Sequence, residues 1–359
     1  MTTALLRLEP SCSVLTSHHI ALVELAYITN NIEPALPIIE KVAVFFPVSK
    51  APTDTRLCDM QLPPTLYITV DSGFTAKLTS RLVMQYDLLV ANCFVQLRSW
   101  ERAFDALERL ISYPTKDQAC SKIMSEGYNK WVLVGLILNG KTPSLPSHIW
   151  SGPQKAFATL GKPYASIANA FDTKTAAELK AEFESLGPQF WSDEGNLGLM
   201  NYVLAHYQRW KILDLRRVYT KISLEQIRML TQSAETGAAL GTEAKVLELL
   251  QDMIAGGMLS GKVVPAADGK PAHLVFLPPA ERLSEAAFAA EMLRTSQRIQ
   301  ALAPLINITN DRLGTSRDYV RFLAGQQNGK GKGVLAEALM AFDSQIEDED
   351  LMTGLVSGH

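Results

Sequence analysis

Charge is the property that this sequence has least of. Charged residues make up 20% of its 359 positions, and the formal net charge is -3, whereas 47% of the residues are hydrophobic. A soluble domain has about 25% charged residues, so a part of the surface is expected to be apolar. The high apolar content excludes a disordered chain, and the slightly negative net charge argues against a protein that binds nucleic acid through bulk positive charge. The length is typical of about two or three domains.

Long hydrophobic runs are missing as well. The longest apolar stretch runs from Trp131 to Leu138, eight residues, and a helix that crosses a membrane needs about 20. Near the start, Arg7, Glu9 and Pro10 interrupt the apolar residues that a signal peptide would need. We therefore expect no membrane partner and a location inside the cell.

Groupings of residues typical of catalytic or metal sites are also absent. The four cysteines, at 12, 58, 93 and 120, contain no C-x-x-C pair, so we interpret them as small buried apolar residues. The histidines form neither H-x-H nor H-E-x-x-H, and no serine lies in a G-x-S-x-G turn. The sequence predicts no catalytic residue, no metal ligand and no cofactor.

The first 160 residues have the apolar spacing of paired helices. One predicted pair covers 78–97 and 100–111, joined by a turn at Arg98-Ser99, and its length of about 35 residues is that of a tetratricopeptide-like unit. An earlier pair is predicted over 17–29 and 33–46, followed by a long connection from Pro47 to Pro64. Because this array begins almost at once, either it starts abruptly or it lacks N-terminal repeats.

Helices continue through 161–222, as the first part of a second domain. Thr175 and Glu178 form a capping box for a helix that ends at Gly187-Pro188. Two further helices are predicted over 193–207 and 210–222, the second with a buried face of Ile212, Leu215, Val218, Tyr219 and Ile222.

A winged helix is predicted over 223–279. Two short helices, 224–230 and 242–255, precede a hairpin made of 262–264, a turn at Asp268-Gly269, and 273–276. The second helix has Glu243, Glu248 and Asp252 against one cation, so it is unsuited to a DNA groove. The hairpin's unpaired edges could instead pair with another such module, and the residues predicted for that contact are Val263, Val264, Leu274, Val275 and Phe276. An equally open alternative is that the hairpin only covers its own helices.

A long helix follows over 280–306. One stripe of it contains Phe288, Met292, Thr295, Ile299, Leu302 and Ile306, at alternating spacings of four and three residues. A period of about 3.5 residues is typical of packing against other helices, so Phe288, Met292, Ile299 and Leu302 are predicted to contact partner subunits. The remaining 307–359 ends in acidic residues and is predicted to be a mostly disordered tail.

One string competes with this interpretation. Residues 135–142, Gly-Leu-Ile-Leu-Asn-Gly-Lys-Thr, satisfy the P-loop pattern G-x-x-x-x-G-K-[ST]. A phosphate-binding loop must expose its amides, but apolar residues fill this one, and Pro143 stands where the following helix should begin. We therefore favour a buried helix over 128–138 with Gly140 as its left-handed cap, and keep a P-loop NTPase as the less favoured hypothesis.

Helical repeats followed by a winged helix and a long terminal helix resemble PCI-domain proteins, the scaffolding subunits of the proteasome lid, the signalosome and an initiation-factor complex. Within them the sequence is similar to the third-subunit family of the COP-nine signalosome. The resembling stretches are 33–40, 97–104, 126–141, 162–171, 196–200 and 222–227. The family usually has about a hundred further residues before the point where this sequence begins.

This resemblance implies a mainly α fold and a non-catalytic role. The complex removes a ubiquitin-like modifier from cullin-RING ligases with a zinc metalloprotease in a different subunit, and a member of this family would lie beside the first and eighth subunits. A scaffold subunit of the proteasome lid or of the initiation-factor complex is the alternative.

Overall fold

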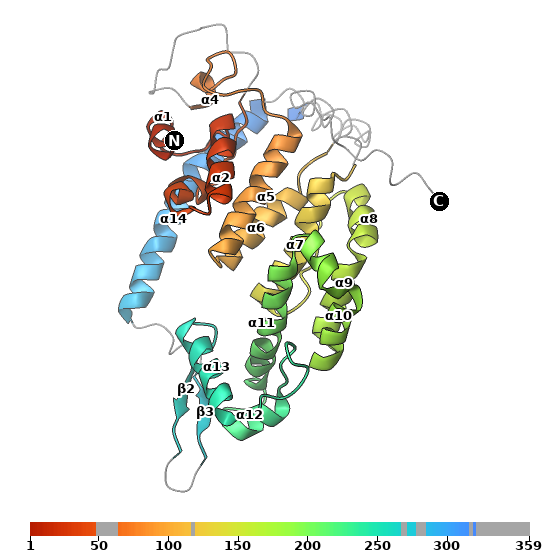
Figure 1. Cartoon of the computed structure of the whole chain (residues 1–359). Helices are drawn as coiled ribbons and strands as arrows, with labels where there is room; N and C mark the ends of the chain where they lie inside the picture. Colours follow the sequence, from red (N-terminus) through yellow and green to blue (C-terminus); the bar gives the residue numbers. More distant parts are fainter. Residues whose placement is uncertain (48–63, 116–118, 267–270, 278–284, 316–318, 321–359) are drawn as a thin grey trace. The chain divides into compact units, whose positions relative to one another are not determined.

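The computed structural model describes residues 1–47, 64–115, 119–266, 271–277, 285–315 and 319–320 (Figure 1). These residues are mainly helical, as the sequence predicts, and contain one small sheet. They divide into two compact units, Met1–Ala165 and a second that begins at Ser166. The predicted connection over 48–63, the turn at Asp268-Gly269 and the tail from 321 lie outside the described residues.

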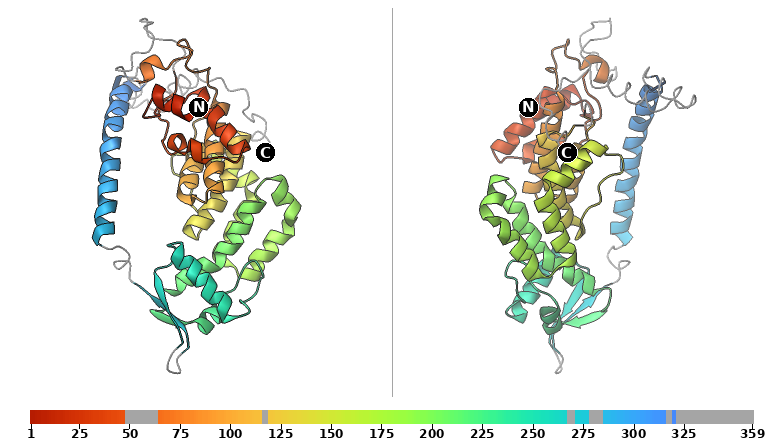
Figure 2. Two further views of the ribbon diagram at one scale, coloured as in Figure 1. Left: turned by 60° about the vertical axis from the view of Figure 1, so that its left-hand side comes forward. Right: turned by 90° about the vertical axis from the view of Figure 1, so that its right-hand side faces the viewer.

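Helices are the regular elements of the first unit among its described residues. Its elements are α1 (Thr2–Leu8), α2 (Ser17–Ile28), η1 (Glu33–Ala35), α3 (Leu36–Ile39), α4 (Pro64–Tyr67), α5 (Ser80–Gln96), α6 (Trp100–Ile111), α7 (Lys122–Asn139) and α8 (Ser151–Leu160). Helices α5, α6 and α7 pack against one another in sequence order (Figure 2).

The helix pair α5 and α6 confirms the strongest apolar pattern in the sequence. The Thr79 hydroxyl accepts a hydrogen bond from the Leu82 amide and so starts α5 where the apolar spacing begins. Between the helices Arg98 has φ 56°, the left-handed conformation that lets the chain reverse within a few residues. The buried side chains then meet across the pair, with Phe94 on α5 and Leu107 on α6 both in the core.

The predicted helix over 33–46 is wrong beyond its first two turns. Pro34 and Pro37 occupy first turns of η1 and α3, where a missing amide costs nothing. After Ile39 the chain becomes extended, because the amides of Val44 and Phe45 donate to the Ser13 carbonyl group. Backbone pairing between distant segments thus replaces the helix. The short α1 in front of α2 has no counterpart in the predictions.

Helix α7 confirms the buried-helix interpretation of its segment. The Ser121 hydroxyl accepts hydrogen bonds from the amides of Ile123 and Met124 at its start. At its end Gly140 has φ 67°, and its amide donates to the Leu136 carbonyl group. A glycine adopts this left-handed cap without strain.

The second unit combines helices with the sheet. Helix α9 (Lys162–Thr173) begins in the first unit and continues into the second, which further contains α10 (Ala176–Asp193), α11 (Leu197–Leu215), β1 (Lys221–Ser223), α12 (Leu224–Leu230), α13 (Glu243–Ala255), β2 (Gly261–Val264), β3 (His273–Phe276) and α14 (Glu285–Thr315).

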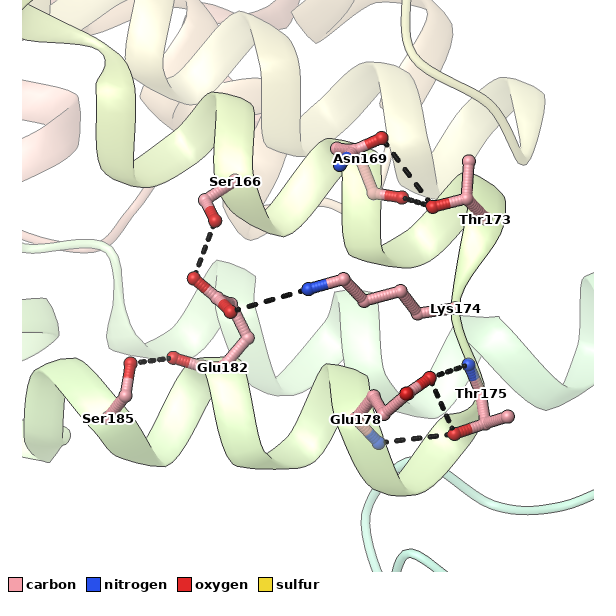
Figure 3. Close-up of polar contacts among 8 residues, drawn as sticks. All are labelled: Ser166, Asn169, Thr173, Lys174, Thr175, Glu178, Glu182 and Ser185. Atoms are coloured by element: carbon pink, nitrogen blue, oxygen red, sulfur yellow. Dashed lines mark hydrogen bonds and ion pairs between the residues drawn. The ribbon is translucent and has the colours of Figure 1, made fainter.

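Polar contacts join α9 to α10 (Figure 3). In the capping box, the Thr175 amide donates to the Glu178 carboxylate at 2.9 Å, and the Glu178 amide donates to the Thr175 hydroxyl at 3.4 Å. Glu182, one turn later, accepts from the Ser166 hydroxyl at 2.5 Å and pairs with Lys174 at 3.8 Å. The predicted start of α10 is confirmed, and Gly187, at φ 78°, breaks the helix where the sequence predicts its end.

Helix α11 corrects the prediction of two helices over 193–207 and 210–222. It runs without a break to Leu215, since nothing between Tyr207 and Trp210 interrupts the helical hydrogen bonds. Most of the predicted buried face is confirmed, since Ile212 and Ile222 are buried and Leu215 and Tyr219 pack against the same core. The prediction is wrong at Val218, which is 76% exposed, and Ile222 is buried from a strand instead of a helix.

Candidate subunit interface

The sheet of the second unit has three strands, whereas the sequence predicts two. Their order is β1-β3-β2, all antiparallel, with Ile222 opposite Leu274 on one side and Val263 opposite Leu274 on the other. Strand β1 therefore pairs the edge of β3 that the prediction left open. Within the described residues, the hairpin's remaining free edge is that of β2.

One face of this sheet belongs to the core of the second unit. Leu274 is fully buried and Phe276 is 8% exposed, and both pack with side chains of α11, α12 and α13 such as Ile212, Ile227 and Leu250. The structure corrects the predicted contact surface at Leu274 and Phe276, because core side chains offer nothing to a partner. For these two residues the alternative, that the hairpin covers its own helices, is the one observed.

The other face of the sheet remains accessible. Val264 and Val275 are half-buried, and Val275 lies opposite Lys221 on β1 and Lys262 on β2, both exposed. Val263 is also half-buried but packs against the core from its edge strand. The accessible surface thus contains Val264 and Val275, and Val275 lies between Lys221 and Lys262. It adjoins the free edge of β2.

Helix α14 exposes the whole predicted stripe. Phe288 is 56% exposed, Met292 59%, Ile299 62% and Leu302 46%. Ile306, the last residue of the stripe, is also exposed, and so are Leu293 and Leu313, which the prediction omitted. No other side chain in the described part of the chain covers these residues, and an exposed apolar face at helical spacing is typical of a contact surface. Leu293 was missed because it lies on a different side of the helix, more than a quarter of a turn away from the stripe.

The helix is also longer than the sequence predicts (Figure 2). It continues to Thr315, so residues 307–315 are helical and the prediction of disorder is wrong for them. Asn307 and Asn310 are weak helix formers, but the apolar spacing continues through Ile306 and Leu313 and extends the same face. Of the predicted range, 280–284 lies outside the described residues.

Helix α13 occupies the position of a DNA-recognition helix but has the wrong charge. Glu243, Glu248 and Asp252 are exposed along it, against the single cation Lys245. Asp252 also forms an ion pair with Arg209 of α11 at 3.9 Å, so the positive charge of Arg209 is already paired within the protein. Phosphate groups would be repelled from this face.

The P-loop string has the geometry of a helix. Gly135 lies inside α7, and a Cβ atom built on it would be 2.6 Å from the Pro143 ring, so the chain is packed where a phosphate would have to enter. Leu136 and Ile137 are buried in the same turn. No phosphate-binding loop exists at this string, and Lys141 lies exposed beyond the helix.

The part of the chain that the structure describes contains no group of three or more residues able to hold a metal ion. Cys12, Cys93 and Cys120 are buried free thiols, and burial raises the pKa of Cys93 to about 11 and that of Cys120 to about 12. Such thiols act as core residues. Cys58 lies outside the described residues. Among those described, no helix is long and apolar enough to cross a membrane.

Comparisons with known proteins agree with this arrangement of elements. A family model described as COP9 signalosome complex subunit 3, N-terminal helical repeats, matches residues 1–150. A Neurospora crassa protein named COP9 signalosome complex subunit 3 is 49% identical over 366 residues, 99% of this chain and 73% of the relative. The protein of that name from Emericella nidulans is 27% identical over 95% of this chain and 69% of the relative, and the one from Arabidopsis thaliana 29% over 44% and 36%.

Proposed function

The chain belongs to the COP9 signalosome subunit 3 family, and from this membership we propose that it is a non-catalytic scaffold subunit of the signalosome. It is a PCI-type protein in this proposal, with helical repeats over about 1–160 and a winged-helix domain over about 161–279. Its role is to hold sister subunits in position while the chemistry takes place elsewhere in the complex.

The exposed apolar face of α14 is the observation that carries the proposal. Phe288, Met292, Ile299 and Leu302 each expose about half or more of their surface, and burying such side chains against a partner is worth about 1.5–3 kcal/mol each. A 31-residue helix with this pattern suits a bundle with helices of other subunits.

The free edge of β2 provides a second contact. Its unpaired amides and carbonyl groups can accept a strand of a neighbouring winged helix, with Val263, Val264 and Val275 beside the junction. Lys221 and Lys262 would favour a neighbour with acidic side chains at that position.

The first and eighth signalosome subunits are the proposed neighbours. The proposed activity of the assembly is deneddylation of cullin-RING ubiquitin ligases, with the zinc metalloprotease in another subunit, and the proposed location is cytoplasm and nucleus. No nucleic acid, membrane or cofactor enters this proposal.

Affinity purification of the tagged full chain, followed by mass spectrometry, tests the proposal. We expect the signalosome subunits to be recovered together and in equal amounts. Recovery of proteasome-lid or initiation-factor subunits in their place would assign the same scaffold role to a different complex. A chain that purifies alone would contradict the scaffold role itself.

Nucleotide binding is tested separately with the same protein. We expect ATP with magnesium to leave the thermal unfolding temperature unchanged in the wild type and in Lys141→Ala. Protection of the wild type that Lys141→Ala abolishes would reinstate the P-loop hypothesis.

A further inference from the structure

The first unit contains a cavity with no assigned role. Its volume is about 310 Å³, at the small end of the range of ligand pockets. It lies between the segment that follows α3, one face of α5 and the end of α6. Its lining residues are Leu15, Ile39, Lys41, Val42, Ala43, Phe46, Val83, Tyr86, Asp87, Val90, Arg109, Ser112, Tyr113 and Pro114.

Most of this lining is apolar, but one side carries an ion pair. Arg109 donates to a single carboxylate oxygen of Asp87, from Nε at 3.4 Å and from Nη2 at 3.3 Å. The Asp87 side chain is 14% exposed and that of Arg109 is 37% exposed. The carboxylate is therefore already engaged, while the guanidinium group keeps further N–H donors for a ligand.

Two other polar groups of the lining are donors as well. The Ser112 hydroxyl is buried and has no hydrogen-bond partner among the described residues, an arrangement that is unfavourable unless something binds there. Lys41 adds a second positive charge at the cavity, although it also donates to the Pro10 carbonyl group. The charged lining thus consists of two cations and one carboxylate.

Burial weakens the one negative charge further. It raises the pKa of Asp87 to about 6, although the adjacent Arg109 acts in the opposite direction. Near neutral pH a fraction of the Asp87 side chains is therefore protonated, and the cavity becomes still more positive.

We propose that this cavity binds the C-terminal residue of a partner protein, an apolar side chain with its free carboxylate. The apolar lining takes the side chain, while Arg109, Ser112 and Lys41 provide donors for the carboxylate. A cavity of about 310 Å³ suits one chain end better than a peptide that runs through. A cationic ligand is disfavoured because it would have to displace Arg109 from Asp87. The site lies in the repeat unit and does not depend on the interface proposed for α14.

Ligand-detected NMR with the full chain and four small probes tests this assignment. The probes are N-acetylphenylalanine, its uncharged amide, the cation phenethylamine, and N-acetyl-aspartyl-phenylalaninamide, whose carboxylate is on a side chain. We expect N-acetylphenylalanine to bind most tightly, by about tenfold over its amide, because a charge-assisted hydrogen bond is lost in the amide.

Three variants locate the binding. Arg109→Gln should weaken N-acetylphenylalanine about tenfold. Ala43→Phe, which fills the cavity from its half-buried rim, should abolish binding. Arg102→Gln is the matched control, because Arg102 lies two turns earlier on α6 and pairs with Glu40 outside the cavity. Circular dichroism shows that each variant is folded.

The proposal is overturned by any of three results: no binding of N-acetylphenylalanine at millimolar concentration, tighter binding of phenethylamine or of the aspartyl probe, or binding that a folded Ala43→Phe retains. Equal weakening by Arg109→Gln and Arg102→Gln would contradict it too, since only a general charge effect would then be at work.

Discussion

Helices α7 and α14 both contain many large apolar side chains, but their surroundings are opposite. In α7 most side chains are buried, among them Trp131, Leu133 and Leu136, whereas the stripe of α14 is exposed from Phe288 to Ile306. The periodicity of a sequence therefore predicts a helix and its apolar face but does not say whether the cover comes from the same chain. Helix α7 is covered by α5, α6 and α8 of the same chain. For α14 we propose that the covering helices belong to another subunit.

The difference also shows where the exposed apolar surface expected from the low charge content lies. The largest group of exposed apolar side chains in the described residues lies on α14, and others are exposed at Val218 and Met229 in the second unit and at Leu25 and Ile28 in the first. A surface of this kind is stable in water only at a cost in solubility, which a permanent partner removes.

Truncation of one large side chain in each helix should give the largest contrast. Trp131 is 1% exposed and stacks on Phe104 at a ring distance of 5.3 Å, so Trp131→Ala should lower the free energy of unfolding by about 3–5 kcal/mol. Met292→Ala on α14 should change it by less than about 0.5 kcal/mol.

Hydrogen exchange in increasing urea, followed on peptides of each unit, measures both variants. If Met292→Ala lowered the free energy of unfolding as much as Trp131→Ala, α14 would be packed within its own chain. That result would contradict the contrast between α7 and α14.

Acidification should loosen the packed unit through His19. Burial lowers the pKa of His19 to about 4, below its ordinary value of 6.5, so between these pH values the unfolded chain binds a proton that the folded chain does not. Stability is therefore lost as the pH falls, by about 2 kcal/mol from this residue between pH 7 and pH 5.

The measurement is the free energy of unfolding of wild type and His19→Gln at both pH values. Glutamine keeps the capping box with Thr16, and the variant should lose about 2 kcal/mol less than the wild type. Because the pKa of Asp87 is raised, this residue adds stability as the pH falls. Both proteins contain Asp87, so its contribution cancels when the two pH profiles are compared. Identical pH profiles would show that His19 is solvated.

The same glycine substitution should have opposite signs in the two helices. Gly135→Ala places a methyl group 2.6 Å from Pro143, and this overpacking outweighs the better helix propensity of alanine, for a net loss of about 1 kcal/mol. Gly314→Ala meets nothing within 4 Å and should stabilise the end of α14 by a few tenths of a kcal/mol, about the smallest effect that we predict.

Thermal unfolding monitored by circular dichroism compares these two variants. Stabilisation by Gly135→Ala would show that the Pro143 ring can move away, and that α7 is less tightly covered than its burial indicates.

Local signals in the sequence predicted local structure well. The capping box at Thr175 and the left-handed cap at Gly140 lie where predicted, because each depends on residues within a few positions of one another. The predictions were wrong where contacts between segments far apart in the sequence determine the local structure. The chain after Ile39 pairs with Ser13, and β1 forms only because β3 offers its edge.

The candidate interface could be predicted in part for the same reason. Alternation along β3 does not say which face meets the helices, so Leu274 and Phe276 were assigned to the surface although they complete the core. The stripe of α14 was predicted residue by residue, because a single helix determines it. The cavity beside Arg109 joins segments that are far apart in the sequence, and no local pattern indicates it.

Assembly of α14 variants tests the central claim most directly. Phe288→Asp and Ile299→Asp place a charge on the exposed stripe, and Gln297→Asp places the same charge on the opposite side of the helix. Burying an unpaired charge in an interface costs several kcal/mol. Tagged full chains with the two stripe substitutions should fold normally and recover no signalosome subunits, whereas Gln297→Asp should recover them like the wild type. Normal recovery with both Phe288→Asp and Ile299→Asp would contradict the account.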